Sequence, residues 1–485
     1  MFCRIAVVLF GCGVLAASLP AGAQDGTLDH AFGYGNGFRG ISYSGLDTSE
    51  DDFTDLPAAH VVLRARTLLV QPDGRIIYGV GYHPHHNDPG VLEMTRTLPD
   101  GSVDDSLTAQ AVTGLSIASG PASMGLQSNG KVIVLAYGYA GNANDFVVFR
   151  YNSDGSLDGN WGSSGCLDVS YTLVPAVSVT PTDVLVQTDD KVIITGTATT
   201  SAGVSYFVAL RLTKDGLPDN GYGSDNNGQI VVTRFGVLAS APPTEVLHHA
   251  RLSAKGNLFL GGWTQPNSNG GIFDPPLNKA SIAIAKLTSA GALDGSFGNG
   301  GVVVYNLNQV GSLGATDIAL TRNEGVYALT NATSVVRFLK NGGADPAFGG
   351  GIATFTPLDP LSALALPTVS YALAVQEQDG KVVIAGQSDS SGGKNYAMAA
   401  RLLTNGSPDP EFGTANSGTG VFLQNTNVGN LPFEEGGVIA QQSGQIIIGG
   451  KVQHGDYAVY GINYIPIIYR LRVDRIFYDG GENSP

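Results

Sequence analysis

The sequence predicts an all-β chain folded as a seven-bladed β-propeller with four-stranded blades. Two sequence phrases alternate seven times, glycine is abundant at 67 of 485 residues, and charged residues make up only 14 % of the chain. An average soluble domain has about 25 % charged residues and about 7 % glycine. Repeats of about 60 residues that each supply four short strands are typical of propeller blades.

The first phrase predicts strands A and B of each blade. It is an apolar run, often ending in glutamine, followed by a turn and a β-branched run, as in residues 69–79. A turn in which glycine allows a positive φ angle, placed between two apolar strands, predicts a β-hairpin. The turns recur at intervals of 55 to 69 residues, at Asp73-Gly74, Asn129-Gly130, Asp189-Asp190, Lys255-Gly256, Glu324-Gly325, Asp379-Gly380 and Ser443-Gly444.

The second phrase predicts strand C, a turn, and strand D. Its centre is Asp-x-x-aromatic-Gly, with a basic residue eight positions before the aspartate in most copies. The aspartates are Asp29, Asp104, Asp158, Asp219, Asp294, Asp345 and Asp409. The residues three positions later are Phe32, Leu107, Trp161, Tyr222, Phe297, Phe348 and Phe412. The bases are Arg96, Arg150, Arg211, Lys286, Arg337 and Arg401.

The two ends of the chain predict how the ring closes. Residues 26–33 contain the second half of the second phrase with no strand C before it, and residues 469–473 form a strand C with no Asp-x-x-Phe-Gly after it. The strand near residues 38–44 is therefore expected to be strand D of the last blade, with Arg470 paired to Asp29. The predicted propeller spans residues 24–476 and leaves a tail at 477–485.

The two phrases resemble the delta-60 repeat family of bacterial β-propellers, with a looser likeness to NHL-type blades. The resemblance covers nearly all of residues 25–476, and Leu107-Thr108 departs from the aromatic-Gly pattern. It implies a secreted propeller. It implies no settled activity and supplies no catalytic residues.

The N-terminus predicts export. Arg4 precedes an apolar run from Ile5 to Ser18, and Ala21-Gly22-Ala23 is a small-x-small cleavage site, so residues 1–23 are expected to be a signal peptide cleaved near Ala23. No later segment offers the roughly 20 apolar residues that span a bilayer. The sequence therefore predicts a monomer that is secreted or periplasmic and has no membrane span.

Charge and cysteine content exclude several functions. Removal of Arg4 with the signal leaves 25 Lys and Arg against 41 Asp and Glu, a net charge of −16. Nucleic acid is a polyanion, so a chain this acidic is not expected to bind it. Cys166 is the single cysteine of the predicted mature chain, so no intrachain disulfide is expected. Its place in a repeat strand predicts a packed side chain rather than a nucleophile.

Residues that recur in every blade are expected to be structural, so functional residues should lie where the repeat is broken. The run His83-Pro-His85-His86-Asn-Asp88 has suitable ligand types for a divalent metal, with solvated loop histidines as the alternative. His248 and His249 at strand A of the fourth blade, with Trp263, are candidate ligand-binding residues. Trp263 offers a ring on which a sugar could stack.

Two functions lead from the sequence, and a structural role in the envelope is also compatible with it. The first is a non-enzymatic binding or recognition module for a protein or glycan. The alternative is a secreted hydrolase or lyase with a metal-assisted site at the His-rich loop face. The chain has no Gly-x-Ser-x-Gly elbow after a strand, no Walker motif and no His-Glu-x-x-His, so no catalytic residue and no organic cofactor are assigned.

Overall fold

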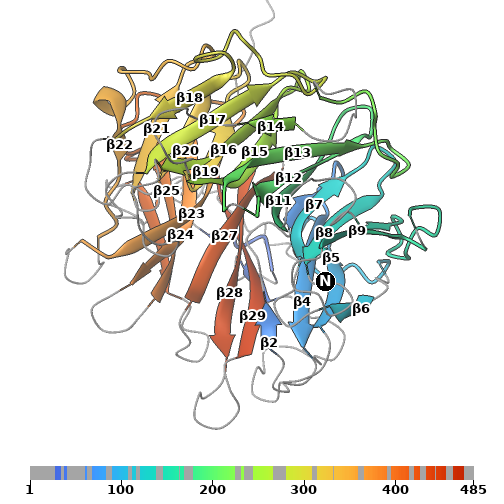
Figure 1. Cartoon of the computed structure of the whole chain (residues 1–485). Coiled ribbons are helices and arrows are strands. Elements are labelled where there is room, and N and C mark those ends of the chain that lie inside the picture. Colours follow the sequence, from blue (N-terminus) through green and yellow to red (C-terminus); the bar gives the residue numbers. More distant parts are fainter. Residues whose placement is uncertain are drawn as a thin grey trace, which may run out of the picture.

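The computed structural model is a ring of seven β-sheets around one axis, which confirms the predicted seven-bladed propeller (Figure 1). It describes residues 28–33, 38–40, 60–62, 68–83, 90–107, 112–115, 121–137, 146–162, 164–168, 178–201, 203–223, 231–233, 244–265, 280–307, 314–330, 333–358, 365–389, 395–413, 420–425, 433–442, 444–454 and 463–473. Within these residues no helix is long and apolar enough to cross a membrane. The predicted signal peptide and C-terminal tail lie outside them and stay predictions.

Each blade is an antiparallel meander, and its strands are labelled A to D in order from the ring axis outwards. Blade 1 contains β2 (His60–Val62), β3 (Leu68–Val70), β4 (Ile76–His83), β5 (Gly90–Thr97) and β6 (Val112–Leu115). Blade 2 contains β7 (Pro121–Leu126), β8 (Val132–Tyr137), β9 (Phe146–Tyr151) and β10 (Cys166–Asp168). Blade 3 contains β11 (Ser178–Val186), β12 (Val192–Thr199), β13 (Ser205–Leu212) and β14 (Val231–Thr233). Blade 1 has one strand more than predicted, because its strand A is split into β2 and β3, which pair with opposite ends of β4.

Blades 4 to 6 follow the same order around the ring. Blade 4 contains β15 (Thr244–Leu252), β16 (Leu258–Gln265), β17 (Ser281–Leu287) and β18 (Val302–Tyr305). Blade 5 contains β19 (Asp317–Leu320), β20 (Val326–Leu329), β21 (Ser334–Phe338) and β22 (Ala353–Thr354), with the 3-10 turn η2 (Gly349–Gly351). Blade 6 contains β23 (Thr368–Val375), β24 (Val382–Asp389), β25 (Asn395–Leu402) and β26 (Val421–Asn425). Blade 7 contains β27 (Phe433–Gln442), β28 (Gln445–His454), β29 (Asn463–Leu471) and β1 (Phe38–Gly40).

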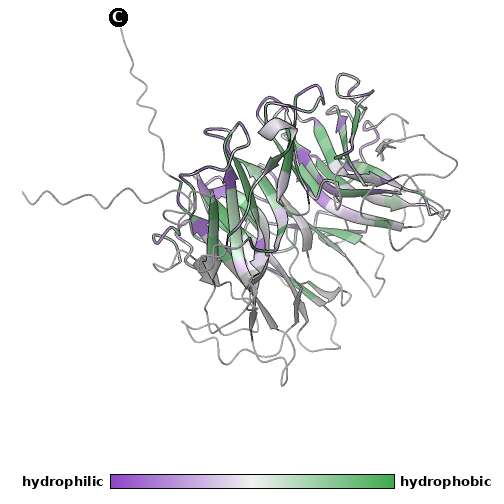
Figure 2. Ribbon diagram, turned by 90° about the vertical axis from the view of Figure 1, so that its left-hand side faces the viewer, coloured by the Kyte–Doolittle hydropathy of each residue, from purple (hydrophilic) through white to green (hydrophobic). Residues whose placement is uncertain are grey.

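The core lies between neighbouring sheets, because the middle strands bury both faces. Every residue of β13 is buried. Its alternate residues Tyr206, Val208 and Leu210 pack with side chains of blade 2, whereas Phe207 and Ala209 pack with side chains of blade 4. Successive residues of a strand point to opposite faces, so a nearly continuous apolar sequence suits a blade covered on both sides. Figure 2 shows the hydrophobic residues concentrated in the strands.

The ring closes through the N-terminal segment, as predicted. β1 pairs antiparallel with β29, Phe38 opposite Tyr469, and the amide of Asp29 donates to the carbonyl of Arg470 at 2.8 Å. The A strands also contact one another in an unbroken circle, from β3 through β7, β11, β15, β19, β23 and β27 back to β3. Residues more than 400 positions apart in sequence therefore belong to one blade.

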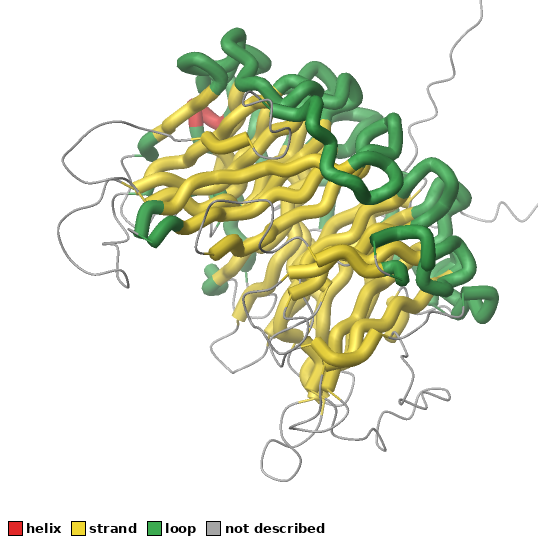
Figure 3. The backbone as a smooth tube through the Cα atoms, turned by 45° about the vertical axis from the view of Figure 1, so that its right-hand side comes forward, coloured by secondary structure: helices red, strands yellow, loops and turns green. Residues whose placement is uncertain are grey.

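The A–B and C–D turns of all blades lie on one face of the ring. In an antiparallel meander the A–B and C–D turns lie at the same end of the strands, and the described loops cluster there (Figure 3). This end is called the hairpin face below. The B–C and D–A connections lie at the opposite end, and most of their residues fall outside the described part of the chain.

Candidate functional site

The recurring aspartates and bases form one ion pair in every blade. In each pair the base lies on strand C and the carboxylate follows the C–D turn, with nitrogen–oxygen distances of 2.6 to 3.4 Å. The second oxygen of each aspartate accepts the backbone N–H two residues later, so all seven form the expected Asx-turn. The predicted pair across the seam, Arg470 and Asp29, is present at 2.8 Å.

In blades 1, 2, 3, 5 and 7 the same arginine also joins its blade to the next. Arg150 donates through Nη1 to the Lys214 carbonyl of blade 3 at 2.7 Å, and its guanidinium stacks 4.6 Å from the centroid of Trp161. Equivalent bonds to the next blade's turn run from Arg96, Arg211, Arg337 and Arg470. The recurring hairpin glutamine also joins neighbouring blades. Gln187 of blade 3 accepts a hydrogen bond from Arg211 and donates one to the carbonyl of Gly256 in blade 4. The repeated polar residues are therefore structural.

Blade 4 keeps the ion pair with a different set of residues. Its base, Lys286, lies 2.9 Å from Asp294 and 3.1 Å from Glu324, which comes from the hairpin of blade 5. Glu324 is buried and also accepts from Ser253 and Asn257 at 2.8 Å. Ser253 stands at the position that glutamine holds in other hairpins, and Asn257 directly follows the Lys255-Gly256 turn, which replaces Asp-Gly. A carboxylate from the next blade thus replaces the missing inter-blade contact.

The ion pairs predict a loss of stability in acid. Hydrogen bonds from Ser296 and Lys286 lower the pKa of Asp294 to about 2. Burial alone would raise the pKa of Asp158, but bonds from Lys131 and Asn160 and the charge of Arg150 lower it. A carboxylate whose folded pKa lies below its unfolded value of about 3.9 stabilises the fold above that value. This stabilisation is lost as the pH falls further.

We therefore expect the melting temperature to change little between pH 7 and pH 5 and to fall steeply between about pH 4 and pH 2. Melting curves recorded across this range test the expectation, and the Asp294→Asn variant should show a smaller fall than the parent protein. An identical fall in the two proteins would show that Asp294 does not contribute.

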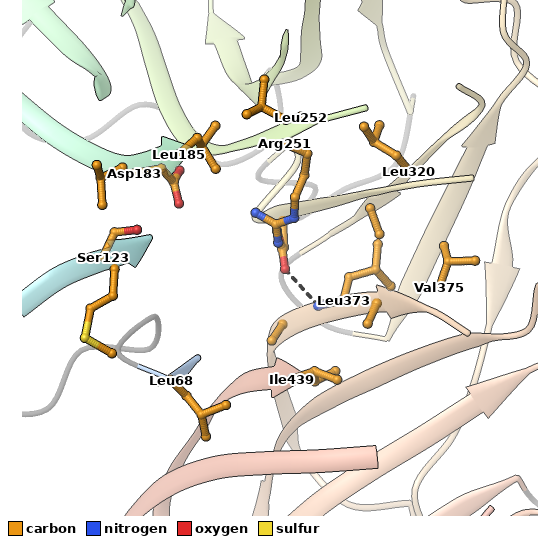
Figure 4. Close-up of a pocket in the computed structure, with 16 residues that line it drawn as sticks. Leu68, Ser123, Asp183, Leu185, Arg251, Leu252, Leu320, Leu373, Val375 and Ile439 are labelled. Carbon is orange, nitrogen blue, oxygen red and sulfur yellow. Dashed lines mark hydrogen bonds and ion pairs between the residues drawn. The ribbon is translucent and has the colours of Figure 1, made fainter. Parts of the chain in front are cut away.

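A cavity of about 380 Å³ lies on the ring axis near the hairpin face (Figure 4). Its walls come from the A strands of all seven blades, within four residues of each A–B turn. The lining residues are Leu68, Ser123, Met124, Asp183, Val184, Leu185, Arg251, Leu252, Asp317, Ala319, Leu320, Ala372, Leu373, Ala374, Val375 and Ile439. Each of the seven A strands thus contributes at least one residue to the wall of the cavity.

Arg251 and Asp317 form an ion pair in this cavity. Nη2 of Arg251 lies 2.7 Å from Oδ1 of Asp317, and Nη1 donates to the carbonyl of Ala250 at 2.9 Å. Asp317 also accepts the backbone N–H groups of Ile318 at 2.7 Å and Leu373 at 2.8 Å. The carboxylate is thus held by the backbones of two blades, and Figure 4 shows the guanidinium directed into the open space.

Asp183 holds the neighbouring blades together in the same way. Its Oδ2 accepts the backbone N–H of Ala250 at 2.8 Å, which is equivalent in the repeat to the bond between Asp317 and Leu373. The same oxygen lies 3.6 Å from Nδ1 of His249. Asp183 is on blade 3, between Ser123 on blade 2 and His249 on blade 4. A Ser-His-Asp triad requires the histidine between the other two, so this arrangement is not such a triad.

The histidines and tryptophan singled out in the sequence lie in different settings. His248 and His249 are within β15, which is strand A of blade 4, and their rings meet edge to face at 6.5 Å. Trp263 is half-buried in β16, opposite Val246 and Ile282. The backbone of His83 ends β4, whereas His85, His86 and Asp88 lie outside the described residues.

Metal and thiol chemistry find no support among the described residues. There, no three His, Cys, Asp or Glu side chains come together as a metal site. Cys166 is half-buried in β10, and burial together with the Asp168 charge raises its thiol pKa to about 11. A thiol with this pKa is protonated at neutral pH and is a poor nucleophile.

Sequence reasoning missed the three charged residues of the cavity. The available signal was a break in the repeat. The last position before each A–B turn is held by Gln71 in blade 1 and by Ser253 in blade 4. Two residues before this position, blade 4 has Arg251. The other six copies have Leu69, Gly125, Leu185, Ala319, Ala374 and Ala440. An arginine at a position that is otherwise small or aliphatic could have identified the axis as a candidate site.

Solved structures resemble the chain in fold alone. An unknown-function protein from Dyadobacter fermentans has 10 % identity and a TM-score of 0.43, covering 90 % of this chain and 100 % of its own. The polysaccharide lyase Uly1 has 10 % identity and a TM-score of 0.43, with coverages of 89 % and 94 %. An α-L-arabinofuranosidase from Fusarium graminearum has 9 % identity and a TM-score of 0.37, with coverages of 71 % and 91 %.

The family comparison matches the repeat itself. Four segments, at residues 71–107, 127–160, 187–222 and 377–412, match the family described as a β-propeller domain of unknown function, DUF5122. Each segment runs from the hairpin of one blade to the Asp-x-x-aromatic region of that blade. No curated protein matches the sequence. The chain is therefore a β-propeller in which four blades match the DUF5122 model, and this agrees with the delta-60 resemblance of its two phrases.

Proposed function

We propose that this protein is a non-catalytic recognition module for a protein or glycan, exported by its N-terminal segment to the periplasm or beyond. One observation carries the proposal. The repeated charged residues are engaged in contacts within and between blades, whereas Arg251 departs from the repeat and presents a partly exposed guanidinium in an open axial cavity. A rigid scaffold that displays one unrepeated polar group is suited to binding.

Binding without turnover is the expected result. The purified protein is applied to arrays of glycans and of peptides, and saturable binding to a defined member is expected. The mass of that ligand should be unchanged after prolonged incubation with the protein. The exposed variant Arg322→Leu, whose side chain is 75 % exposed, should bind as the parent does. Conversion of a defined ligand to product would contradict the proposal.

A second candidate is a hydrolase or lyase, favoured by the carboxylate of Asp183 close to His249. Paired acid and base groups of this kind carry proton transfer in many enzymes. The His-rich segment with His83, His85, His86 and Asp88 would then bind a divalent metal. Metal analysis, with melting curves before and after chelation, separates the two functions. A stoichiometric metal lost on replacing the three histidines favours the enzyme, and a metal-free protein with unchanged melting favours the recognition module.

A further inference from the structure

We propose that the axial cavity binds the carboxylate of an aliphatic acid, with Arg251 as the anion-binding side chain. The proposal rests on the recognition function above and names the chemistry of its ligand. Within that function, the occupant we propose is the C-terminal residue of a polypeptide that ends in an aliphatic side chain. A free aliphatic acid carries the same group and is distinguished by experiment.

The walls of the cavity select an aliphatic ligand. Its volume of about 380 Å³ lies within the range of small-molecule sites, about 300 to 1,000 Å³. Twelve of the sixteen lining residues are aliphatic or methionine, and none is aromatic. Sugar-binding sites commonly use an aromatic face for stacking, which these walls do not offer. Leucine-like and valine-like groups match walls of this composition.

Of the three charged side chains that line the cavity, that of Arg251 is the most exposed. The side chain of Arg251 is 29 % exposed, whereas those of Asp183 and Asp317 are 3 % and 2 % exposed. Arg251 uses two of its N–H groups, for Asp317 and for the carbonyl of Ala250. A guanidinium has five N–H donors in a planar fork that matches a carboxylate. Donors thus remain for an incoming anion.

The bonds from the backbone to Asp317 do not depend on the guanidinium. Asp317 accepts the backbone N–H groups of Ile318 and Leu373, so both of its oxygens keep a donor without Arg251. Asp183 makes the equivalent bond to Ala250, and the ionisable side chain 3.6 Å from it is that of His249 rather than an arginine. At the position of Arg251 the neighbouring blade 3 carries Leu185. Arg251 is therefore an added feature of the repeat.

The test compares an acid with its neutral amide. N-acetyl-leucine and N-acetyl-leucinamide have nearly the same shape, and isothermal titration calorimetry measures the binding of each to the purified protein. A charge-assisted hydrogen bond to arginine predicts at least about tenfold tighter binding of the acid. Arg251→Leu, which copies the residue of blade 3, should abolish this preference. Arg322→Leu should keep it.

Equal binding of acid and amide, or an unchanged preference in Arg251→Leu, would overturn the inference. If Arg251→Leu does not fold, the double variant Arg251→Leu/Asp317→Asn removes the buried carboxylate charge as well, and the same loss is expected. A glycan or protein ligand found on the arrays whose binding is unaffected by Arg251→Leu would overturn this inference and leave the recognition function intact.

A second comparison identifies the source of the carboxylate. A peptide ending in leucine with a free carboxylate, the same peptide amidated, and octanoate are titrated under the same conditions. Tighter binding of the free-carboxylate peptide than of octanoate supports the polypeptide C-terminus. The reverse order, with octanoate preferred, overturns the assignment to a polypeptide.

Discussion

Replacing Arg150 with alanine is expected to lower the free energy of unfolding by about 3–5 kcal/mol, the range for breaking one side of a buried ion pair. Arg150 and Asp158 are 5 % and 3 % exposed, so the carboxylate would lose a buried partner at 2.7 Å. The bond to Lys214 in blade 3 and the stacking on Trp161 would be lost with it. Lys131 stays 2.6 Å from Asp158, which places the expected loss near the lower end.

Urea unfolding of the parent and the variant measures this loss. The matched control is Arg322→Ala, because the pair of Arg322 with Glu377 is 3.8 Å long and both side chains are 75 % exposed. This control should change the free energy of unfolding by no more than about 0.5 kcal/mol. Equal and small effects of the two variants would show that the strand-C pairs do not hold the blades together.

Replacing Phe32 with alanine is expected to cost about 3–5 kcal/mol, the range for truncating a fully buried phenylalanine. Phe32 is 0 % exposed, and the guanidinium of Arg470 lies 4.7 Å from the centroid of its ring. A Cβ atom added at Gly101 of blade 1 would come within 2.8 Å of this ring, so Phe32 fills the space between blades 7 and 1. The variant therefore tests closure of the ring.

Denaturant unfolding and limited proteolysis report on Phe32→Ala together. Val369→Ala is the control, because Val369 is 39 % exposed and lies within one blade. A loss of stability for Phe32→Ala as small as that of the control would mean that the N-terminal segment is not packed at the seam. The predicted result is a large loss accompanied by cleavage in the segment before β1.

The architecture could be predicted from the sequence because its signals are local. In six blades the base and its aspartate are eight residues apart, so each pair is visible in one short window, as for Arg96 and Asp104. The seam is the one long-range case, and it followed from two incomplete phrases at the chain ends. The split of strand A in blade 1 was not predicted, because β2 and β3 have no distinct turn signal in the sequence.

The axial cavity could not be predicted in the same way, because residues far apart in sequence form it. Asp183 bonds to Ala250 and Asp317 to Leu373, across separations of 67 and 56 residues. A β-bulge between Pro181 and Asp183 shifts the register of β11 at the first carboxylate, and a bulge between Ser370 and Ala372 shifts the register of β23 near the donor Leu373. The contact of Glu324 with Lys286 of blade 4 could not be predicted for a similar reason. The signal in the sequence was the absence of the hairpin glutamine from blade 4.

The central claim is that repeated charges build the ring and that the unrepeated Arg251 serves binding. One side-by-side measurement tests it: urea unfolding and titration with N-acetyl-leucine for the parent, Arg150→Ala and Arg251→Leu. We predict that Arg150→Ala loses stability and, while folded, binds the acid as the parent does. Arg251→Leu should lose the preference for the acid, and it should also lose stability, because it leaves the buried Asp317 without its charged partner. An unchanged preference for the acid in Arg251→Leu, or unchanged stability in Arg150→Ala, would contradict the account.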